Sequence, residues 1–464
     1  MLRRVAAVML ALLLVGGAVS VNLDRSPETA AAGTPGGPAR LLLAAPEGSR
    51  SVALRPVDPV TLSDLPGFSP IPFHNSSAHA FTPDGRTLAF IRWSSGEHGR
   101  TTMLHFVDVE SWEEETVPLA LAHDWVGHLF FGADGSALYW IEQITADRGA
   151  RLTYVLHRYS RTDATTGVLT KLPEGFSPLA VQLLADGRRV AIFGQSLTEE
   201  YLAEGDARVL LVGLSDGAIE ADIPLPGVLQ GQRQTAAGVS EYVLPGLAWD
   251  AARSLLYVVD GAPDRVTVVD LSEGRVARQA ELRAVSWLER LGLVRVAAAK
   301  ALPGTRLSAA LSPGGDRLYV TAFREEVEGP FHSPTAWRGV PLGLTVIDTA
   351  SLRPVGRLDL PVSDLALTPD GRQLLLWGAS WDFAAGSARE GHGVYVVDAA
   401  RLTQVAHVLP GSDATLLGFS PDGRYAYIGE DTGQGKVRHV VLHLATGRLG
   451  AVREVSRGLG FYVQ

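Results

Sequence analysis

Residues 419–430 read FSPDGRYAYIGE, the sequence of a strand end, a tight turn and the start of a second strand. Pro421 has the fixed φ of the second position of a type I turn, Asp422 can accept hydrogen bonds from nearby backbone, and Gly423 tolerates positive φ. A type I turn followed by a left-handed glycine is a common three-residue hairpin connection. Apolar and aromatic residues lie on both faces of the strand after the turn, so we expect it to be covered on both sides.

Close copies of this hairpin recur along the chain, which makes it a repeat protein. The copies are FTPDGRTLAF from Phe81, FGADGSALYW from Phe131, LLADGRRVAIF from Leu183, AWDAARSLLYVV from Ala248, LSPGGDRLYVTAF from Leu311 and LTPDGRQLLLWG from Leu367. The spacing between successive turns leaves room for about four strands and their connections.

A second signature is an alternating strand that ends in a turn, as in MLHFVDVESW, RVTVVDLSEGR, LTVIDTASLRP and VYVVDAARLTQ. The strand ends in an aspartate in each of these copies, at Asp108, Asp270, Asp348 and Asp398. A short polar acceptor at this position caps the turn. We expect capping rather than metal binding or catalysis, because the four aspartates belong to separate repeats.

Each repeat therefore supplies one small antiparallel sheet. A lone sheet of this size is marginal in water, whereas radial stacking buries both faces and leaves few open edges. We predict an all-β fold, a single β-propeller of four-stranded blades over residues 41–464. FSPDGR, RLYVTAF and LTVIDTAS resemble the WD-repeat-like and YVTN-type β-propeller families of exported bacterial proteins. That resemblance implies the fold and says almost nothing about function.

The two ends of the repeat region look like parts of one blade. Residues 39–62 read as the second and third strands of a repeat without its first strand, and the final GLGFYVQ reads as a first strand without successors. We expect the N- and C-terminal strands to pair and to close the propeller. This favours eight blades; seven is the alternative, if the terminal pieces only extend an existing blade.

Residues 1–20 have the pattern of a secretory signal peptide, with Arg3 and Arg4 before an apolar run and small residues at its end. The alternative is an uncleaved membrane anchor over residues 5–22, since the apolar stretch is borderline for a membrane span. Residues 21–40 are rich in Ala, Gly and Pro and predict a flexible linker. We expect an extracytoplasmic protein that is secreted, periplasmic or at the cell surface, with the membrane involved only through this segment.

Composition excludes several classes of function. The formal net charge is −9 and no basic run is present, so nucleic acid is not an expected partner. The chain has no cysteine, which excludes disulfides, thiolate metal sites and a cysteine nucleophile. No Walker loop, Rossmann fingerprint or GxSxG elbow occurs.

The long connections fall on one side of the repeat unit, because the strand-end turns stay short throughout. We expect loops at 94–100, 194–206, 225–243, 284–303, 324–341 and 378–393, with an amphipathic helix over residues 284–301. Long loops on a rigid scaffold often bind ligands, and exposed Trp, Tyr and Arg are typical contact residues. The candidate ligand-binding residues are Trp125, Tyr201, Arg324, Phe331, Trp337, Arg338, Trp381 and Asp382.

A metal site is a weaker hypothesis. Histidines that converge from several repeats could bind copper or zinc, and His74, His123 and His392 are the candidates. No HxH or HExxH spacing supports them, so no cofactor is expected, with a divalent metal as the alternative.

The main hypothesis is a non-enzymatic exported scaffold that binds a protein, peptide or glycan through its loop-rich face. The alternatives are an extracytoplasmic hydrolase or lactonase-like enzyme with a site at the central channel, and a subunit of an envelope redox complex.

Overall fold

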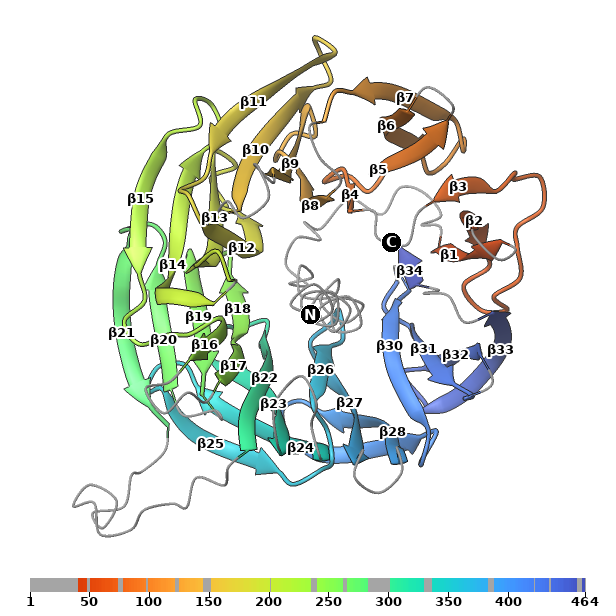
Figure 1. Cartoon of the computed structure of the whole chain (residues 1–464). Helices are drawn as coiled ribbons and strands as arrows, with labels where there is room; N and C mark the ends of the chain where they lie inside the picture. The colour runs from red at the N-terminus through yellow and green to blue at the C-terminus, as the bar shows by residue number, and fades with distance from the viewer. Residues whose placement is uncertain are drawn as a thin grey trace. The chain divides into compact units, whose positions relative to one another are not determined.

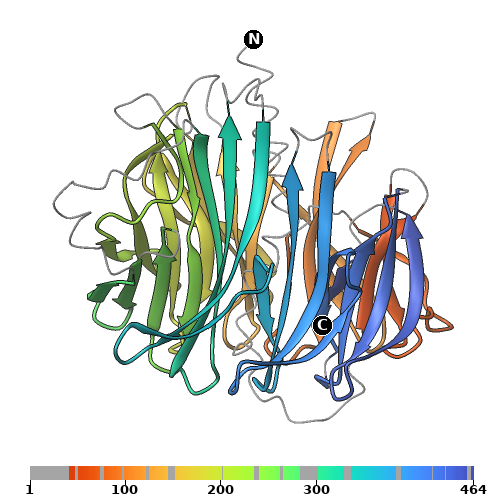
Figure 2. The ribbon, with the colours of Figure 1, turned by 90° about the horizontal axis from the view of Figure 1, so that it is seen from below.

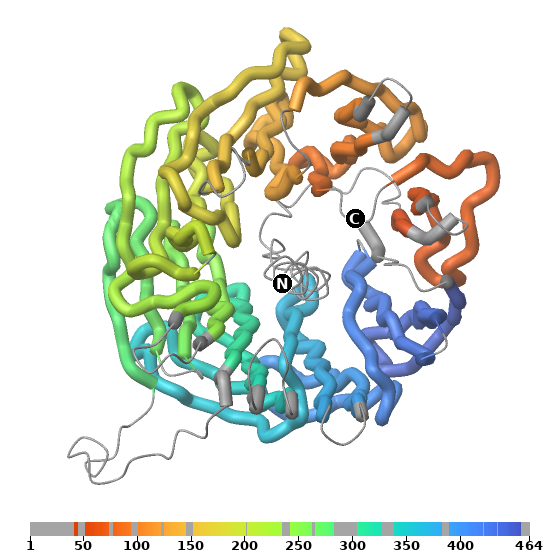
Figure 3. Tube along the Cα trace, in the orientation of Figure 1, coloured from red at the N-terminus to blue at the C-terminus, as the bar shows by residue number. Residues whose placement is uncertain are grey.

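The computed structural model describes residues 41–47, 51–73, 78–96, 99–121, 125–144, 152–200, 202–234, 240–261, 265–282, 301–328, 336–382, 388–420, 422–433, 435–456 and 461–463 (Figure 3). Every regular element in these ranges is a β-strand, which confirms the predicted all-β class. They contain no helix with the length and apolar character needed to cross a membrane. The signal peptide or anchor of residues 1–20 and the linker of residues 21–40 lie outside these ranges and stay predictions.

The described chain divides into two compact units, residues 225–414 and residues 41–224 with 415–463. The second unit is built from sheets of four strands each (Figure 1). The first sheet is β3 (Ile71–Phe73), β2 (Ser51–Val57), β1 (Leu41–Glu47) and β34 (Phe461–Val463). The next three are β4 (His79–Phe81), β5 (Thr87–Gly96), β6 (Gly99–Asp108), β7 (Glu114–Leu119); β8 (Trp125–Phe131), β9 (Ala137–Ile144), β10 (Thr153–Ser160), β11 (Thr165–Lys171); and β12 (Phe176–Leu183), β13 (Arg189–Leu197), β14 (Ala203–Gly213), β15 (Ile219–Pro224). The last is β30 (Asp413–Phe419), whose first two residues are counted with the first unit, β31 (Tyr425–Asp431), β32 (Lys436–His443) and β33 (Arg448–Ser456).

The first unit contains one sheet of four strands and one larger sheet. The small sheet is β18 (Gly246–Asp250), β19 (Leu255–Asp260), β20 (Arg265–Asp270), β21 (Arg275–Glu281). The larger one has ten strands: β16 (Gly231–Gln234), β17 (Ser240–Leu244), β22 (Ala301–Leu311), β23 (Arg317–Glu328), β24 (Ala336–Asp348), β27 (Gln373–Asp382), β28 (Ala388–Asp398) and β29 (Thr403–Val408) in order, with β25 (Arg353–Leu358) on β24 and β26 (Asp364–Leu367) on β27. It thus joins two four-stranded meanders, β22–β25 and β26–β29. These antiparallel meanders are the blades of a β-propeller fold; the preference for eight blades over seven stays a prediction.

The predicted pairing of the two chain ends is confirmed. Strand β1 pairs antiparallel with β34, with Leu42 opposite Val463 and Ala44 opposite Phe461. Strand β1 is buried on both faces: Leu42 belongs to a core with Phe90 of β5, and Leu43 to a core with Tyr427 of β31. Full burial of each leucine stabilises the fold by about 1.5–3 kcal/mol.

The repeated turns form as the sequence predicts. Gly423 has φ 65° and donates its N–H to the Ser420 carbonyl at 2.9 Å, while the Asp422 carboxylate accepts from the Arg424 N–H at 3.1 Å. Asp108 accepts from the backbone N–H groups of Glu110 and Ser111 at 3.0 and 2.7 Å, and these hydrogen bonds hold its pKa below the usual value. The capping role of this aspartate is confirmed.

The expectation of long loops is wrong for the described parts of most of these segments. Strands β5 and β6 run into residues 94–100, β13 and β14 into 194–206, β16 and β17 into 225–243, β23 and β24 into 324–341, and β27 and β28 into 378–393. The physical reason is that continued pairing satisfies the backbone N–H and C=O groups of both strands of a hairpin. Residues 284–300 of the expected helix lie outside the described ranges, and its last residue, Ala301, begins β22 instead.

Candidate functional site

The two hairpins that carry most of the candidate binding residues are joined in one extended sheet. Strands β23 and β24 pair from Glu328 and Ala336 at the hairpin end down into their meander. Near that end β24 also pairs with β27 of the next meander, with Arg338 opposite Asp382 and Gly339 opposite Trp381. Figure 2 shows the long teal strands of this region running side by side. The extended sheet therefore holds these side chains on paired strands rather than on loops.

Cross-strand register sorts the residues into two faces, because residues directly opposite each other share a face and neighbours along a strand alternate. One face, which we call the glycine face, carries Gly304, Phe323, Glu325, Gly339 and Trp381. The other, which we call the exposed face, carries Arg324, Arg338, Val340 and Asp382.

On the glycine face, Trp381 is seated over a position that only glycine can occupy. A Cβ atom built on Gly339 would lie 2.3 Å from Cε2 of Trp381 and 2.4 Å from Cζ of Phe323. The two rings pack with their centroids 4.4 Å apart and their planes tilted by 39°. Trp381 is thus an anchor of the sheet, and only part of its side chain is exposed.

A polar group adjoins this aromatic pair. The Arg306 guanidinium lies 5.4 Å from the centre of the Phe323 ring and 3.5 Å from the Asp364 carboxylate. Asp364 also accepts hydrogen bonds from the hydroxyls of Ser308 and Ser363, at 3.2 and 2.7 Å. Nε of Arg306 and Nε1 of Trp381 are buried and have no partner among the described residues. An unsatisfied buried donor costs about 1–3 kcal/mol, so these atoms suit a water or a ligand acceptor.

Two titratable groups of the glycine face have shifted pKa values. Tyr242 and Glu325 both lie opposite Gly304, one from each neighbouring strand. Burial raises the pKa of Glu325, against the opposing effect of Arg306. Burial and the nearby Glu325 raise the pKa of Tyr242 to about 12. Clusters of shifted groups occur at functional sites more often than elsewhere, although structural networks also produce them.

The side chains of the exposed face are all at least partly exposed. Nε of Arg338 donates to Asp382 at 3.0 Å, with 49% and 36% of the two side chains exposed. Val340 is 46% exposed, and the exposed Arg324 opposite it forms no ion pair within the part of the chain that the structure describes. A cation that forms no ion pair with described residues, beside an exposed apolar side chain, suits a ligand that presents a carboxylate next to an apolar group.

The structure brings together Arg324, Arg338, Trp381 and Asp382 from the predicted site, and it places Trp337 on β24 beside them in sequence. Trp125 belongs to the other unit. It is 43% exposed on β8 and packs against Tyr154 with ring centroids 6.1 Å apart. Tyr201 and Phe331 lie outside the described residues, so their roles stay predictions.

The metal hypothesis is untested at His74 and His123, which lie outside the described residues. His392, on β28, shares a hydrogen bond of 2.8 Å with the Ser380 hydroxyl. Within the described ranges, no three His, Asp or Glu side chains gather in a way that could hold a metal ion.

Sequence reasoning missed Arg306, Asp364 and Tyr242. Their signals were weak, because each stands in an alternating strand or at a strand end where a polar residue is unremarkable. Pairing between strands that are far apart in the sequence brings these three residues close to Glu325 and Phe323.

Comparison with known proteins found no matching family description and no similar sequence among curated proteins. Solved structures with a related arrangement include the periplasmic gluconolactonase PpgL of Pseudomonas aeruginosa, at 15% identity and TM-score 0.47 over 92% of this chain and 99% of that one. Chaetomium thermophilum Sqt1 bound to the N-terminus of a ribosomal protein matches at 14% identity and TM-score 0.44, over 82% and 88% of the two chains. An oligogalacturonate lyase in complex with manganese matches at 14% identity and TM-score 0.41, over 90% and 96%. These values are too low to carry a function to this chain.

Proposed function

We propose that this protein is an extracytoplasmic binding protein, and that it holds a protein or peptide ligand on the exposed face of the extended sheet. The observation that carries the proposal is the grouping of Arg324, Val340 and the Arg338–Asp382 ion pair on one open strand surface. Arginine is enriched among residues that dominate binding energy at protein interfaces.

Rigidity supports binding at this face. The strands that carry it are paired on both sides, and Trp381 with Phe323 fills the space behind them. Side chains on a preformed, rigid sheet lose less conformational freedom on binding than side chains on loops. A segment with an acidic side chain next to an apolar one fits this surface by charge and by hydrophobic contact.

The test is affinity capture from the envelope fraction of the producing cell, followed by measurement of the affinity for the purified partner. The full chain is the bait, and the test variant carries Arg324→Ala, Arg338→Ala and Val340→Ser. The matched control carries Val355→Ser and Arg357→Ala on β25, where both side chains are also exposed. A partner that binds the wild type and the control, and binds the test variant at least about tenfold more weakly, supports the proposal. Equal affinity for all three proteins contradicts it.

A hydrolase or lactonase-like enzyme is the second candidate, and the raised pKa of Glu325 favours it. A buried carboxyl group whose pKa is raised can act as a general acid. Turnover of a panel of lactones, esters and glycosides, abolished by Glu325→Gln, would replace the binding proposal. No turnover by the wild type eliminates this candidate.

A further inference from the structure

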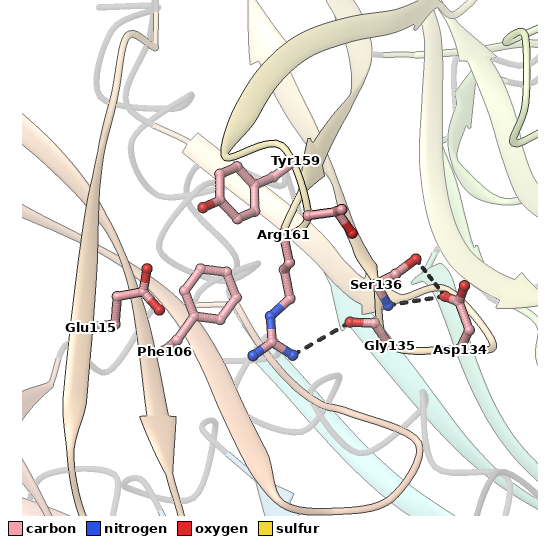
Figure 4. A pocket seen from close by; sticks show the side chains of 8 residues that line it. Phe106, Glu115, Asp134, Gly135, Ser136, Tyr159 and Arg161 are labelled. Atoms are coloured by element: carbon pink, nitrogen blue, oxygen red, sulfur yellow. Dashed lines mark hydrogen bonds between the residues drawn. The ribbon is translucent and has the colours of Figure 1, made fainter.

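A hollow of about 320 Å³ lies in the second unit, between the sheet β4–β7 and the sheet β8–β11. Its lining includes Phe106, Glu115, Asp134, Ser136, Tyr159 and Arg161 (Figure 4). Its volume lies at the lower end of the usual range for small-molecule sites.

Arg161 is an exception within the repeats. In seven of the meanders, the residue that follows the third strand donates its N–H to a carbonyl of the turn between the first and second strands. For Arg161 the acceptor is the Ser136 carbonyl, at 2.9 Å. The six equivalents are Val109, Leu214, Leu271, Thr349, Ala399 and Leu444. All six are buried, whereas Arg161 is exposed. The six equivalents have small or aliphatic side chains, whereas this repeat has an exposed cationic side chain at the same position.

The Arg161 side chain is only partly engaged. Its guanidinium lies 5.2 Å from the centre of the Phe106 ring and makes one long hydrogen bond, 3.4 Å, to the Gly135 carbonyl. A cation at this distance from an aromatic ring is held in place by about 0.5–1 kcal/mol. The remaining guanidinium N–H groups form no hydrogen bond within the described residues and remain as donors.

Two further polar groups of the hollow form no hydrogen bond with described residues: the carboxylate of the exposed Glu115 and the hydroxyl of Tyr159. Figure 4 shows the Tyr159 hydroxyl pointing toward the side on which Glu115 lies. Burial raises the pKa of Tyr159, Glu115 raises it further and Arg161 opposes the shift. Both charged groups therefore affect the pKa of the Tyr159 hydroxyl. Asp134, by contrast, is occupied by the Ser136 backbone and hydroxyl at 2.9 and 2.8 Å.

A purely structural role for Arg161 is the competing explanation. Its equivalent Thr349 donates its hydroxyl to the turn carbonyl of Gly315 at 2.7 Å, so a donor at this position can support the turn. A threonine performs that task with a shorter bond and leaves the position buried. Turn support therefore does not require a long cationic side chain.

We propose that this hollow is a second binding site, and that it takes a neutral sugar residue through adjacent hydroxyl groups. Each hydroxyl of a sugar both donates and accepts, which matches an acceptor at Glu115, a donor and acceptor at Tyr159 and donors at Arg161. An anion would meet the carboxylates of Glu115 and Asp134, and a cation would meet Arg161. A neutral polyol is repelled neither by the carboxylates nor by Arg161.

The test uses the full chain and ligand-observed saturation-transfer NMR with the methyl glycosides of glucose, galactose and mannose. Glycine and inorganic phosphate are the comparison probes. Arg161→Leu restores the side chain typical of the repeat, Arg161→Thr keeps a donor to the turn without the cation, and Glu115→Gln removes the charge. Arg158→Leu, on β10 three residues before Arg161 and outside the lining of the hollow, is the control.

We expect saturable transfer for at least one glycoside and a loss of affinity of about tenfold or more in all three variants of the hollow. The control should bind as the wild type does, and melting of Arg161→Leu and Arg161→Thr followed by circular dichroism should show intact folds. The proposal is overturned if no glycoside gives saturable transfer, if the Arg161 variants keep full affinity, or if glycine or phosphate binds in an Arg161-dependent way in place of the glycosides.

Discussion

Trp381 on β27 occupies the space that the missing side chain of Gly339 leaves on β24, and it packs there against Phe323. This relationship couples two meanders, because Gly339 and Trp381 stand in different repeats. It also fixes the sheet behind the exposed face on which we place the ligand.

Gly339→Ala should therefore destabilise the protein. The added methyl group would lie 2.3 Å from Trp381, and overpacking of this kind costs about 1–3 kcal/mol. The free energy of unfolding, measured by urea denaturation, should fall by that amount. Gly167→Ala on β11 is the control, since a Cβ there meets nothing within 4 Å. Equal effects of the two substitutions would show that Trp381 does not rest on Gly339.

The ion pair between Arg338 and Asp382 should contribute little to stability. Both side chains are more than a third exposed, and pairs of this kind couple by about 0.2–1 kcal/mol. A double-mutant cycle with Arg338→Ala and Asp382→Ala measures the coupling. It should shrink at high salt, because solvent ions screen exposed charges. A coupling well above this range, insensitive to salt, would contradict the exposed geometry.

His439 should make the protein sensitive to mild acid. Burial on β32, with a smaller effect of Arg453, lowers its pKa from 6.5 to about 4. The unfolded chain therefore takes up the proton first as pH falls, so the histidine's contribution to stability is fully present above pH 6.5 and is lost progressively below it. The loss should reach roughly 2 kcal/mol at about pH 5.

His439→Gln cannot be protonated and is the variant that isolates this effect. Urea denaturation of both proteins between neutral pH and about pH 5 should show the additional loss in the wild type alone. Parallel loss of stability in the two proteins would assign the acid sensitivity to other groups.

Deletion of residues 461–464 should lower the melting temperature and promote aggregation. Strand β34 covers the edge of β1, where Leu42, Leu43 and Ala44 are fully buried. Without β34 this edge offers unpaired N–H and C=O groups next to apolar side chains, a template for association between chains. Light scattering during a thermal melt measures both effects, with a chain that lacks only Gln464 as the control. Unchanged melting would mean that the terminal pairing adds nothing to stability.

Much of the fold could be predicted from local sequence. The turn around Asp422 and Gly423 and the aspartate cap at Asp108 depend only on residues within a few positions of each other, so their chemistry can be read directly. Even the pairing of β1 with β34 was predictable, because each terminal segment lacks the partner strands that the other supplies.

The candidate site was predictable only in part. Arg338, Trp381 and Asp382 were recognised as residue types that bind ligands, but their segments were expected to be loops. The pairing of β24 with β27 depends on register between two repeats, which no local pattern encodes. The unusual arginine at position 161 could also have been found from the sequence. Aligning the repeats and comparing the residue that follows the third strand of each would have shown that Arg161 differs from the small or aliphatic residues at the equivalent positions.

The sequence by itself determined the all-β class, the repeated turns and the joining of the chain ends, because turn chemistry and strand alternation are local properties that recur in every repeat. Tertiary structure alone decided which faces Trp381, Glu325 and Arg338 occupy and that Arg161 shares a hollow with Glu115. These relationships come from cross-strand register and from the packing of one sheet on the next, where residues distant in sequence meet and burial sets their chemistry.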